Sequence, residues 1–348
     1  MGKNVLKMKE PIPIGECSEL TMVSARPIDP RSLMNIHAGK CVVRIRTDLE
    51  FYRWVEYMSR LQHYSVDEIS KGYATGWVFR GMESRKWHIV SSFHRHHGKS
   101  NANGIKSMEK RSYEGFIDKE HLKRSEFSTT LDMVSHIQHF GGYTRLIDFS
   151  MSFAVALHFA VRNSSKNVGA VWAVDCKGVR TAQRASEITS KWPGFKRAAA
   201  IARADNPSLI LKKNRELANR ILEGRYDRDD LCENGRVLWV SPTSRNERIK
   251  AQAGLFLMPT LLSKSFEEQL LDPFFERVYS KGDPLNLPET YHEMKRITAD
   301  YRLIRFDFDK SVYGVARAFL HSVNVTDNTL RLEEAQCSGC ANGISKEV

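Results

Sequence analysis

The chain has 348 residues, of which 41% are hydrophobic and 27% charged, and this composition excludes an intrinsically disordered protein. Its formal net charge of +12 indicates a surface that attracts polyanions, although an excess of Lys and Arg on solvated helix faces explains the charge equally well. No apolar run is long enough to cross a bilayer, and six scattered cysteines indicate reduced thiols, so we expect a cytoplasmic protein without a membrane anchor.

The first clear element is a helix that begins near Thr47. Residues 1–46 lack a clear period, and we interpret them as an extended lead-in or an edge of the fold. Thr47 and Glu50 have the spacing of a capping box, and apolar residues then recur at helical spacing as far as Leu61.

Residues 76–81 alternate like a β-strand, with Phe79 and Arg80 on opposite faces. A guanidinium near the end of such a strand is suited to bind phosphate or carboxylate through two parallel hydrogen bonds, and Gly81 would let a ligand approach the backbone. The structural alternative is an ion pair between Arg80 and Asp148, and we weigh the two interpretations equally.

Residues 85–111 are basic, rich in histidine and weakly periodic, so we expect a loop that exposes its charges. Within it, His94, His96 and His97 favour solvated side chains over a metal site, because no partner ligand stands at a recognised spacing. We therefore predict no metal.

The middle of the chain predicts helix, strand and helix in close succession. The first helix runs from about Ser128 to His139 and ends at Gly141, and a strand over residues 143–149 follows. Residues 153–161 are apolar on all sides, which is typical of a buried helix, and Ser150 and Ser152 are N-cap candidates for it.

The second half predicts further strands around a helical insertion at about residues 181–230, and a last amphipathic helix capped by Asp309. The expected strands are 168–175, 236–240, 251–257 and 303–308. We predict an α+β fold with a central mixed β-sheet flanked by helices, one domain over residues 47–334, and a flexible tail over 335–348.

Polar residues in apolar strand contexts mark the candidate site, because an unpaired buried polar group costs about 1–3 kcal/mol. Thr144, Asp148 and Ser150 precede the buried helix, where hydroxyls and free amides bind anions; the alternative is a strand end with an N-cap. Gln252 is expected on one strand face with Arg248 and Lys250, where it orients a substrate hydroxyl or serves as a core amide.

Three ordered motifs resemble those of the FRG family, which is named for a Phe-Arg-Gly signature. The central motif is the run 138–150 followed by 154–160, the opening motif is Phe79–Gly81, and the late motif is the run 248–256. Most FRG proteins have no established biochemistry, so the resemblance by itself implies no activity.

The order of these parts is similar to that of ADP-ribosyltransferases, in which Arg or His and a hydroxyl residue hold NAD and Glu or Gln works near the ribose. This likeness implies an NAD-using enzyme, with catalytic roles for Gln252, Arg80 and Asp148. It also implies that NAD, as substrate, contacts a set of six residues: Phe79, Arg80, Gly81, Thr144, Arg145 and Ser150. The chain has Gln252 where a Glu is usual for efficient transfer.

The acceptor of such a reaction is expected to be a nucleic acid, given the net charge, or a protein. One alternative is a non-catalytic basic protein that binds nucleic acid, or another partner, through residues 85–111 and the segment 212–225. A hydrolase that uses His139 and Asp148 ranks last, because it lacks a second well-spaced catalytic group.

Overall fold

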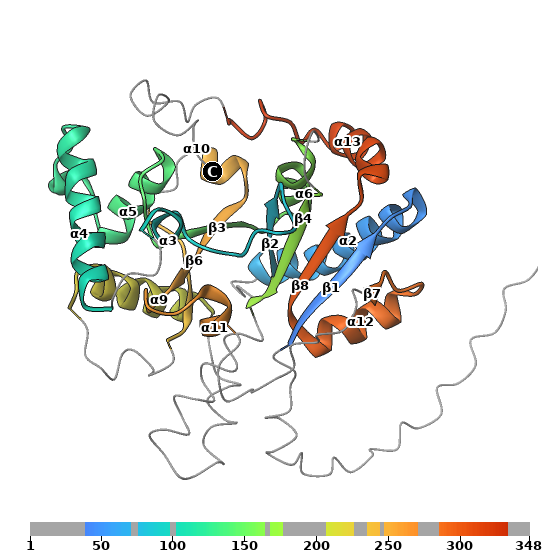
Figure 1. Ribbon diagram of the computed structural model, residues 1–348, viewed down its shortest axis with the longest axis horizontal. Helices are drawn as coiled ribbons and strands as arrows, with labels where there is room; N and C mark the ends of the chain where they lie inside the picture. The colour runs from blue at the N-terminus through green and yellow to red at the C-terminus, as the bar shows by residue number, and fades with distance from the viewer. Residues whose placement is uncertain are drawn as a thin grey trace, which may run out of the picture. The chain divides into compact units, whose positions relative to one another are not determined.

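A mixed β-sheet of eight strands forms the centre of the structure, a computed structural model (Figure 1). The strand order across the sheet is β5-β6-β3-β2-β4-β8-β1-β7, and neighbours are antiparallel except that β1 is parallel to both β7 and β8. The strands are β1 Gly39–Ile45, β2 Trp77–Met82, β3 Ile147–Ser150, β4 Ala170–Asp175, β5 Val237–Val240, β6 Gly254–Pro259, β7 Leu285–Asn286 and β8 Tyr301–Phe308. The α+β fold with a mixed sheet is thus confirmed.

The structure describes eight stretches of the chain, and all of them belong to the unit that begins at His37: 39–70, 76–97, 102–163, 168–176, 207–225, 235–243, 247–270 and 285–332. The predicted tail over 335–348 and much of the predicted insertion over 181–230 lie outside the described residues. Strand β1 lies within the segment that was predicted as a lead-in or an edge of the fold, and it is next to the edge strand β7.

Helices flank the sheet, and the chain order of the elements is the one that Figure 1 shows by colour. Their bounds are α2 Asp48–Ser70, α3 Ser92–His97, α4 Ala102–Lys119, α5 Thr130–His139, α6 Phe153–Val161, α9 Pro207–Leu222, α10 Glu247–Ala251, α11 Phe266–Leu270, α12 Tyr291–Asp300 and α13 Tyr313–Ser322. Within the described ranges, no helix combines the length and the apolar character needed to cross a membrane.

One face of the sheet carries two separate groups of helices. Helices α2, α6, α12 and α13 share a core with β1, β2, β4 and β8, and helices α4, α5 and α9 share another with β5 and β6. Both cores lie on the same face of the sheet. Phe79 of the first core is paired with Ser150, and Phe256 of the second core is paired with Asp148. Paired residues share a face, and so do Asp148 and Ser150, which stand two positions apart on β3. The two groups therefore meet above β2 and β3.

Several local signals act as the sequence predicts. The Glu50 amide donates to Thr47 Oγ1 and the Thr47 amide donates to Glu50 Oε2, both at 3.2 Å, so the capping box precedes α2. Ser152 Oγ accepts from the Val155 amide at 3.4 Å at the start of α6. Gly141 has a φ of +83° just after α5, the left-handed conformation that ends a helix.

The loop prediction for residues 85–111 is wrong, because the segment contains α3 and the first half of α4. Phe93 of α3 and Ile105 of α4 are buried together with Leu262, which lies more than 150 positions further along the chain. This long-range packing stabilises two helices whose own sequences show little periodicity.

The predicted strand over 251–257 is also wrong in its first part. Helix α10 ends at Ala251, Ala253 has a φ of +46°, and β6 begins at Gly254. Ile249 is buried in the core beneath α10, which explains why this segment is helical. Gln252 therefore lies in a turn and does not share a strand face with Arg248 and Lys250.

Two other boundaries differ from the prediction. Strand β3 begins at Ile147, because the Leu146 amide donates to Thr144 Oγ1 at 3.1 Å in place of a sheet partner. Asp309 makes no side-chain cap; a 3-10 turn over Lys310–Val312 follows it, and α13 begins at Tyr313.

Candidate functional site

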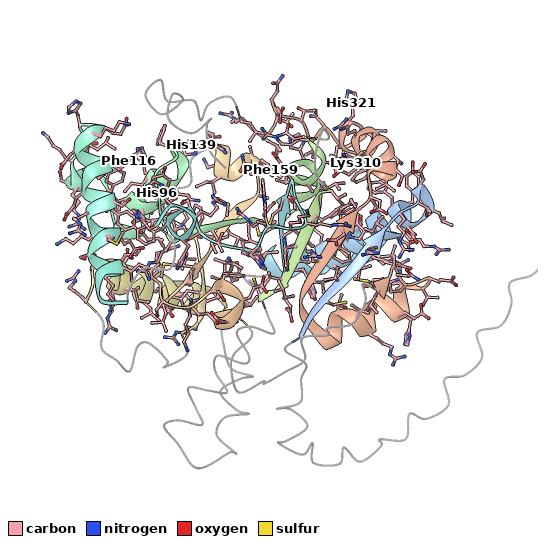
Figure 2. All side chains as sticks on the ribbon, in the orientation of Figure 1. His96, Phe116, His139, Phe159, Lys310 and His321 are labelled. Carbon is pink, nitrogen blue, oxygen red and sulfur yellow. The ribbon has the colours of Figure 1, made fainter. Side chains whose placement is uncertain are left out.

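A cavity of about 220 Å³ lies above β2 and β3, where the two groups of helices meet. Helix α6 forms one side of it, and the end of α5 together with α10 contributes to the other. Figure 2 marks His139 on α5 and Phe159 on α6. The polar and charged residues of its lining are Arg80, Gln138, His139, Asp148, Ser150, Arg248 and Gln252.

Arg80 lies where β2 and β3 diverge after a single pair of opposite residues. The register of β2 with β3 is the single pair Phe79 opposite Ser150, and beyond it Arg80 Nη1 donates to the carbonyl oxygen of Asp148 at 2.5 Å. The Asp148 carboxylate is 3.8 Å from the same nitrogen. Arg80 lines the cavity, and its buried Nε has no hydrogen-bond partner in the described part of the chain.

The charge of Arg80 persists despite its burial. The Arg80 side chain is 17% exposed, and burial lowers its pKa; the carboxylate of Asp148 opposes this effect, and the like charge of Arg95 adds to it. An arginine side chain remains protonated at any physiological pH. The cavity therefore holds a permanent positive charge that is only partly neutralised.

Asp148 is held at the mouth of the cavity by a glutamine. Its side chain is 59% exposed, and Gln138 Nε2 donates to its Oδ2 at 2.8 Å. Gln138 Oε1 in turn accepts from Thr144 Oγ1 at 2.5 Å. Thr144 is buried behind Gln138, outside the cavity lining, so it acts on the cavity through Gln138 alone.

Gln252 presents an amide oxygen that is free of intramolecular hydrogen bonds in the described residues. Its Nε2 donates to the carbonyl oxygen of Leu330 at 3.0 Å, and its own carbonyl oxygen accepts from Ser150 Oγ at 2.7 Å. These two contacts hold both the side chain and the backbone of the turn. Gln252 Oε1 is therefore the amide atom that remains for a ligand.

The FRG domain matches residues 75–168, a stretch that includes β2, α5, β3 and α6. The chain contains an FRG domain. No curated protein matches the chain, and no solved structure does. The FRG match covers Arg80, Gln138 and Asp148, whereas Arg248 and Gln252 enter the cavity from beyond its end.

The FRG tripeptide itself has a packing role as well as a place in the cavity. Phe79 is fully buried in the core, and a Cβ on Gly81 would lie 1.8 Å from the carbonyl oxygen of Ala156. Gly81 therefore permits the close approach of α6 to β2. Gly81 also lines the cavity, so the expectation that a ligand approaches the backbone there stays a prediction.

Arg145 of the FRG domain lies away from the cavity. It forms a buried ion pair with Glu109, to which its Nε donates at 2.6 Å, and its Nη1 donates to the carbonyl oxygen of Thr260 at 3.0 Å. Burial acts to lower the pKa of Arg145, but the charge and hydrogen bonds of Glu109 raise it overall. This geometry gives Arg145 a structural role in place of the predicted cofactor contact.

Gln138 and Phe159 are among the lining residues that the sequence analysis did not propose for the site. Gln138 was noticed as part of the FRG motif, but nothing in its neighbourhood showed that it would hold Asp148. Phe159 gave no signal, because α6 is apolar on all sides and the sequence does not show which face borders a cavity.

The histidines of α3 take part in packing. His94 Nε2 is 2.7 Å from the carbonyl oxygen of Leu262, and the His96 ring stacks on Tyr143 with 3.8 Å between centroids. In the part of the chain that the structure describes, no three His, Cys, Asp or Glu side chains gather as a metal site would require.

Proposed function

We propose that the cavity binds the anionic part of NAD and that this FRG protein is an NAD-using, ADP-ribosyltransferase-like enzyme. One observation carries the proposal: Arg80, whose buried Nε lacks a hydrogen-bond partner in the described chain, lines the cavity with its cationic side chain. Guanidinium groups form charge-assisted hydrogen bonds with phosphate oxygens, so Arg80 would bind an anionic ligand in this cavity.

The size of the cavity supports binding of one end of the dinucleotide. Pockets that enclose a whole small ligand measure about 300–1,000 Å³. The cavity here has about 220 Å³, so the remainder of NAD would lie outside its mouth.

Three side chains have complementary chemistry for this ligand. Arg80 would bind a phosphate oxygen, and Gln252 Oε1 would accept a hydrogen bond from a ribose hydroxyl. Asp148 would orient Arg80, and its exposed carboxylate would stabilise the positive charge that develops on the ribose as nicotinamide leaves. Transfer to a nucleic-acid or protein acceptor completes the proposed reaction.

Binding of nucleic acid without catalysis is the second candidate, and its support is the net charge of +12. Some basic side chains within α9 and just after it already have partners. Arg215 Nε donates to the carbonyl oxygen of Ser241 at 3.2 Å, and Arg225 forms an ion pair with Glu223. We also propose a cytoplasmic location, for which the free buried thiol of Cys41 is the support.

Calorimetric titration with NAD tests the enzyme proposal directly. Arg80→Ala should weaken binding by about ten- to a hundredfold, because a charge-assisted contact is worth about 1.5–3 kcal/mol. Arg80→Lys should restore part of the affinity, since it keeps the charge and loses the fork. Gln252→Ala should instead lower the rate of nicotinamide release.

The matched control is Arg60→Ala, which removes one positive charge from an exposed pair with Glu56 on α2. Thermal melts of all variants show whether they are folded. If folded wild type binds no NAD, or if Arg80→Ala binds it as tightly as wild type does, the proposal is wrong.

A further inference from the structure

The turn that follows α13 contacts both sides of the cavity. We call residues 326–332 the strap. Asp327 Oδ1 of the strap is 2.8 Å from Nε2 of His158 on α6, and the carbonyl oxygen of Leu330 accepts from Gln252 Nε2 at 3.0 Å. The strap thereby joins α6, which forms one side of the cavity, to the turn between α10 and β6 on the other.

The strap is a folded turn with its own hydrogen bonds. The Thr326 amide donates to Thr329 Oγ1 at 2.9 Å, and the Thr329 amide donates to Thr326 Oγ1 at 3.3 Å. The Leu330 amide donates to the Thr326 carbonyl oxygen at 3.0 Å, and the Leu330 side chain is buried. These contacts fix the Leu330 carbonyl oxygen in the position from which it holds Gln252.

A charge on the strap also acts on α10. The hydrogen bond and charge of Lys250 lower the pKa of Glu247, and the positive charge of Arg331 lowers it further. The strap therefore interacts with α6, with α10 and with the turn that carries Gln252.

We propose that the strap is a positioning device that fixes the amide of Gln252 so that its Oε1 faces the ligand. This inference rests on the proposed function, in which Gln252 contacts a ribose hydroxyl. It also accounts for Gln at position 252. An amide can donate to the Leu330 carbonyl oxygen and accept from the ligand at once, whereas a carboxylate has no proton for the Leu330 carbonyl oxygen. Asp327 and His158 are positioning residues that act through Gln252.

The structural part of this inference is tested by hydrogen exchange of the full chain, measured on peptides that cover residues 247–254. Asp327→Ala removes the acceptor for His158 and should speed exchange in this turn, whereas Asp327→Asn keeps Oδ1 and should stay close to wild type. Gln252→Glu should speed exchange in the strap itself. The control is Glu114→Ala, which removes an exposed carboxylate from α4. Unchanged exchange in both Asp327→Ala and Gln252→Glu would overturn the proposal that the strap fixes Gln252.

The functional part is tested by a double-mutant cycle on nicotinamide release. Asp327→Ala should lower the rate about tenfold, the effect of losing one hydrogen-bonded contact, and should leave NAD affinity unchanged. It should have no further effect in the Gln252→Ala background. An additive loss would show that the strap does not act through Gln252. If wild type binds no NAD, the enzyme proposal and this positioning role fail together, while hydrogen exchange still decides whether the strap holds Gln252.

Discussion

Arg80 combines the two roles that the sequence left open, a structural contact with Asp148 and a place in the candidate binding site. Its Nη1 donates to the backbone carbonyl oxygen of Asp148, so it ties β2 to β3 beyond their one paired position. The carboxylate of Asp148 is 3.8 Å away and is also held by Gln138, so it leaves Arg80 Nε without a partner in the described chain. The same side chain thus closes the gap between two strands and has a donor left for an anion.

Glycine substitutions separate the packing role of the Phe-Arg-Gly motif from its place in the cavity. A Cβ at Gly81 would meet the backbone of α6 at 1.8 Å, so Gly81→Ala should lower the free energy of unfolding by about 1–3 kcal/mol or more. Gly115 in α4 has no atom within 4 Å of such a Cβ, so Gly115→Ala should raise it by about 0.5–1 kcal/mol. Urea denaturation measures both changes. Equal urea midpoints for Gly81→Ala and Gly115→Ala would contradict the close approach of α6 to β2 at Gly81.

At the scale of elements, a buried ion pair joins α4 to the end of β6. Glu109 accepts from Arg145 Nε and from the Tyr113 hydroxyl, each at 2.6 Å, and Arg145 Nη1 continues to the carbonyl oxygen of Thr260 just after β6. Burial raises the pKa of Tyr113 well above its usual value, and the charge of Glu109 raises it further, so the hydroxyl stays protonated as a donor. This cluster fixes α4 against the end of β6, and none of its side chains lines the cavity.

Removal of Glu109 should therefore be costly. Glu109→Ala leaves the Arg145 charge buried without its counter-ion, and we expect a loss of about 3–5 kcal/mol in the free energy of unfolding. Glu114→Ala, on the same helix, breaks an exposed pair with Lys110 and should cost less than about 0.5 kcal/mol. Chemical denaturation of both variants makes the comparison, and similar costs for the two would show that the buried pair is not needed.

At the scale of the whole molecule, the sheet extends to residues that precede the first predicted helix. Strand β1 pairs with β8 and β7, and its side chains Cys41, Val43 and Ile45 are buried. We predict that a chain beginning at His37 melts cooperatively, whereas a chain beginning at Thr47 loses this strand and with it solubility or a large part of its stability. Comparison of the two melts, with the full chain as reference, checks this. If the chain that begins at Thr47 is as stable as the chain that begins at His37, β1 is not part of the cooperatively folded unit.

The sequence by itself determined the features that depend on neighbours a few residues apart. The capping box of Thr47 and Glu50, the N-cap at Ser152 and the left-handed Gly141 all follow from local chemistry, and so does the alternation of β2. The fold class was predictable from the succession of strand and helix patterns along the chain. The FRG domain was predictable because three short motifs of that family stand in order in the sequence.

Only the tertiary structure decided which polar residues border the cavity. Arg145 and Arg80 are both arginines in apolar surroundings, but Arg145 meets Glu109, which stands 36 positions away, and Arg80 Nε meets no described partner. Gln252 is held by a carbonyl oxygen 78 positions further along the chain. Whether a buried polar group is satisfied depends on such distant partners, and local sequence patterns contain no information about them.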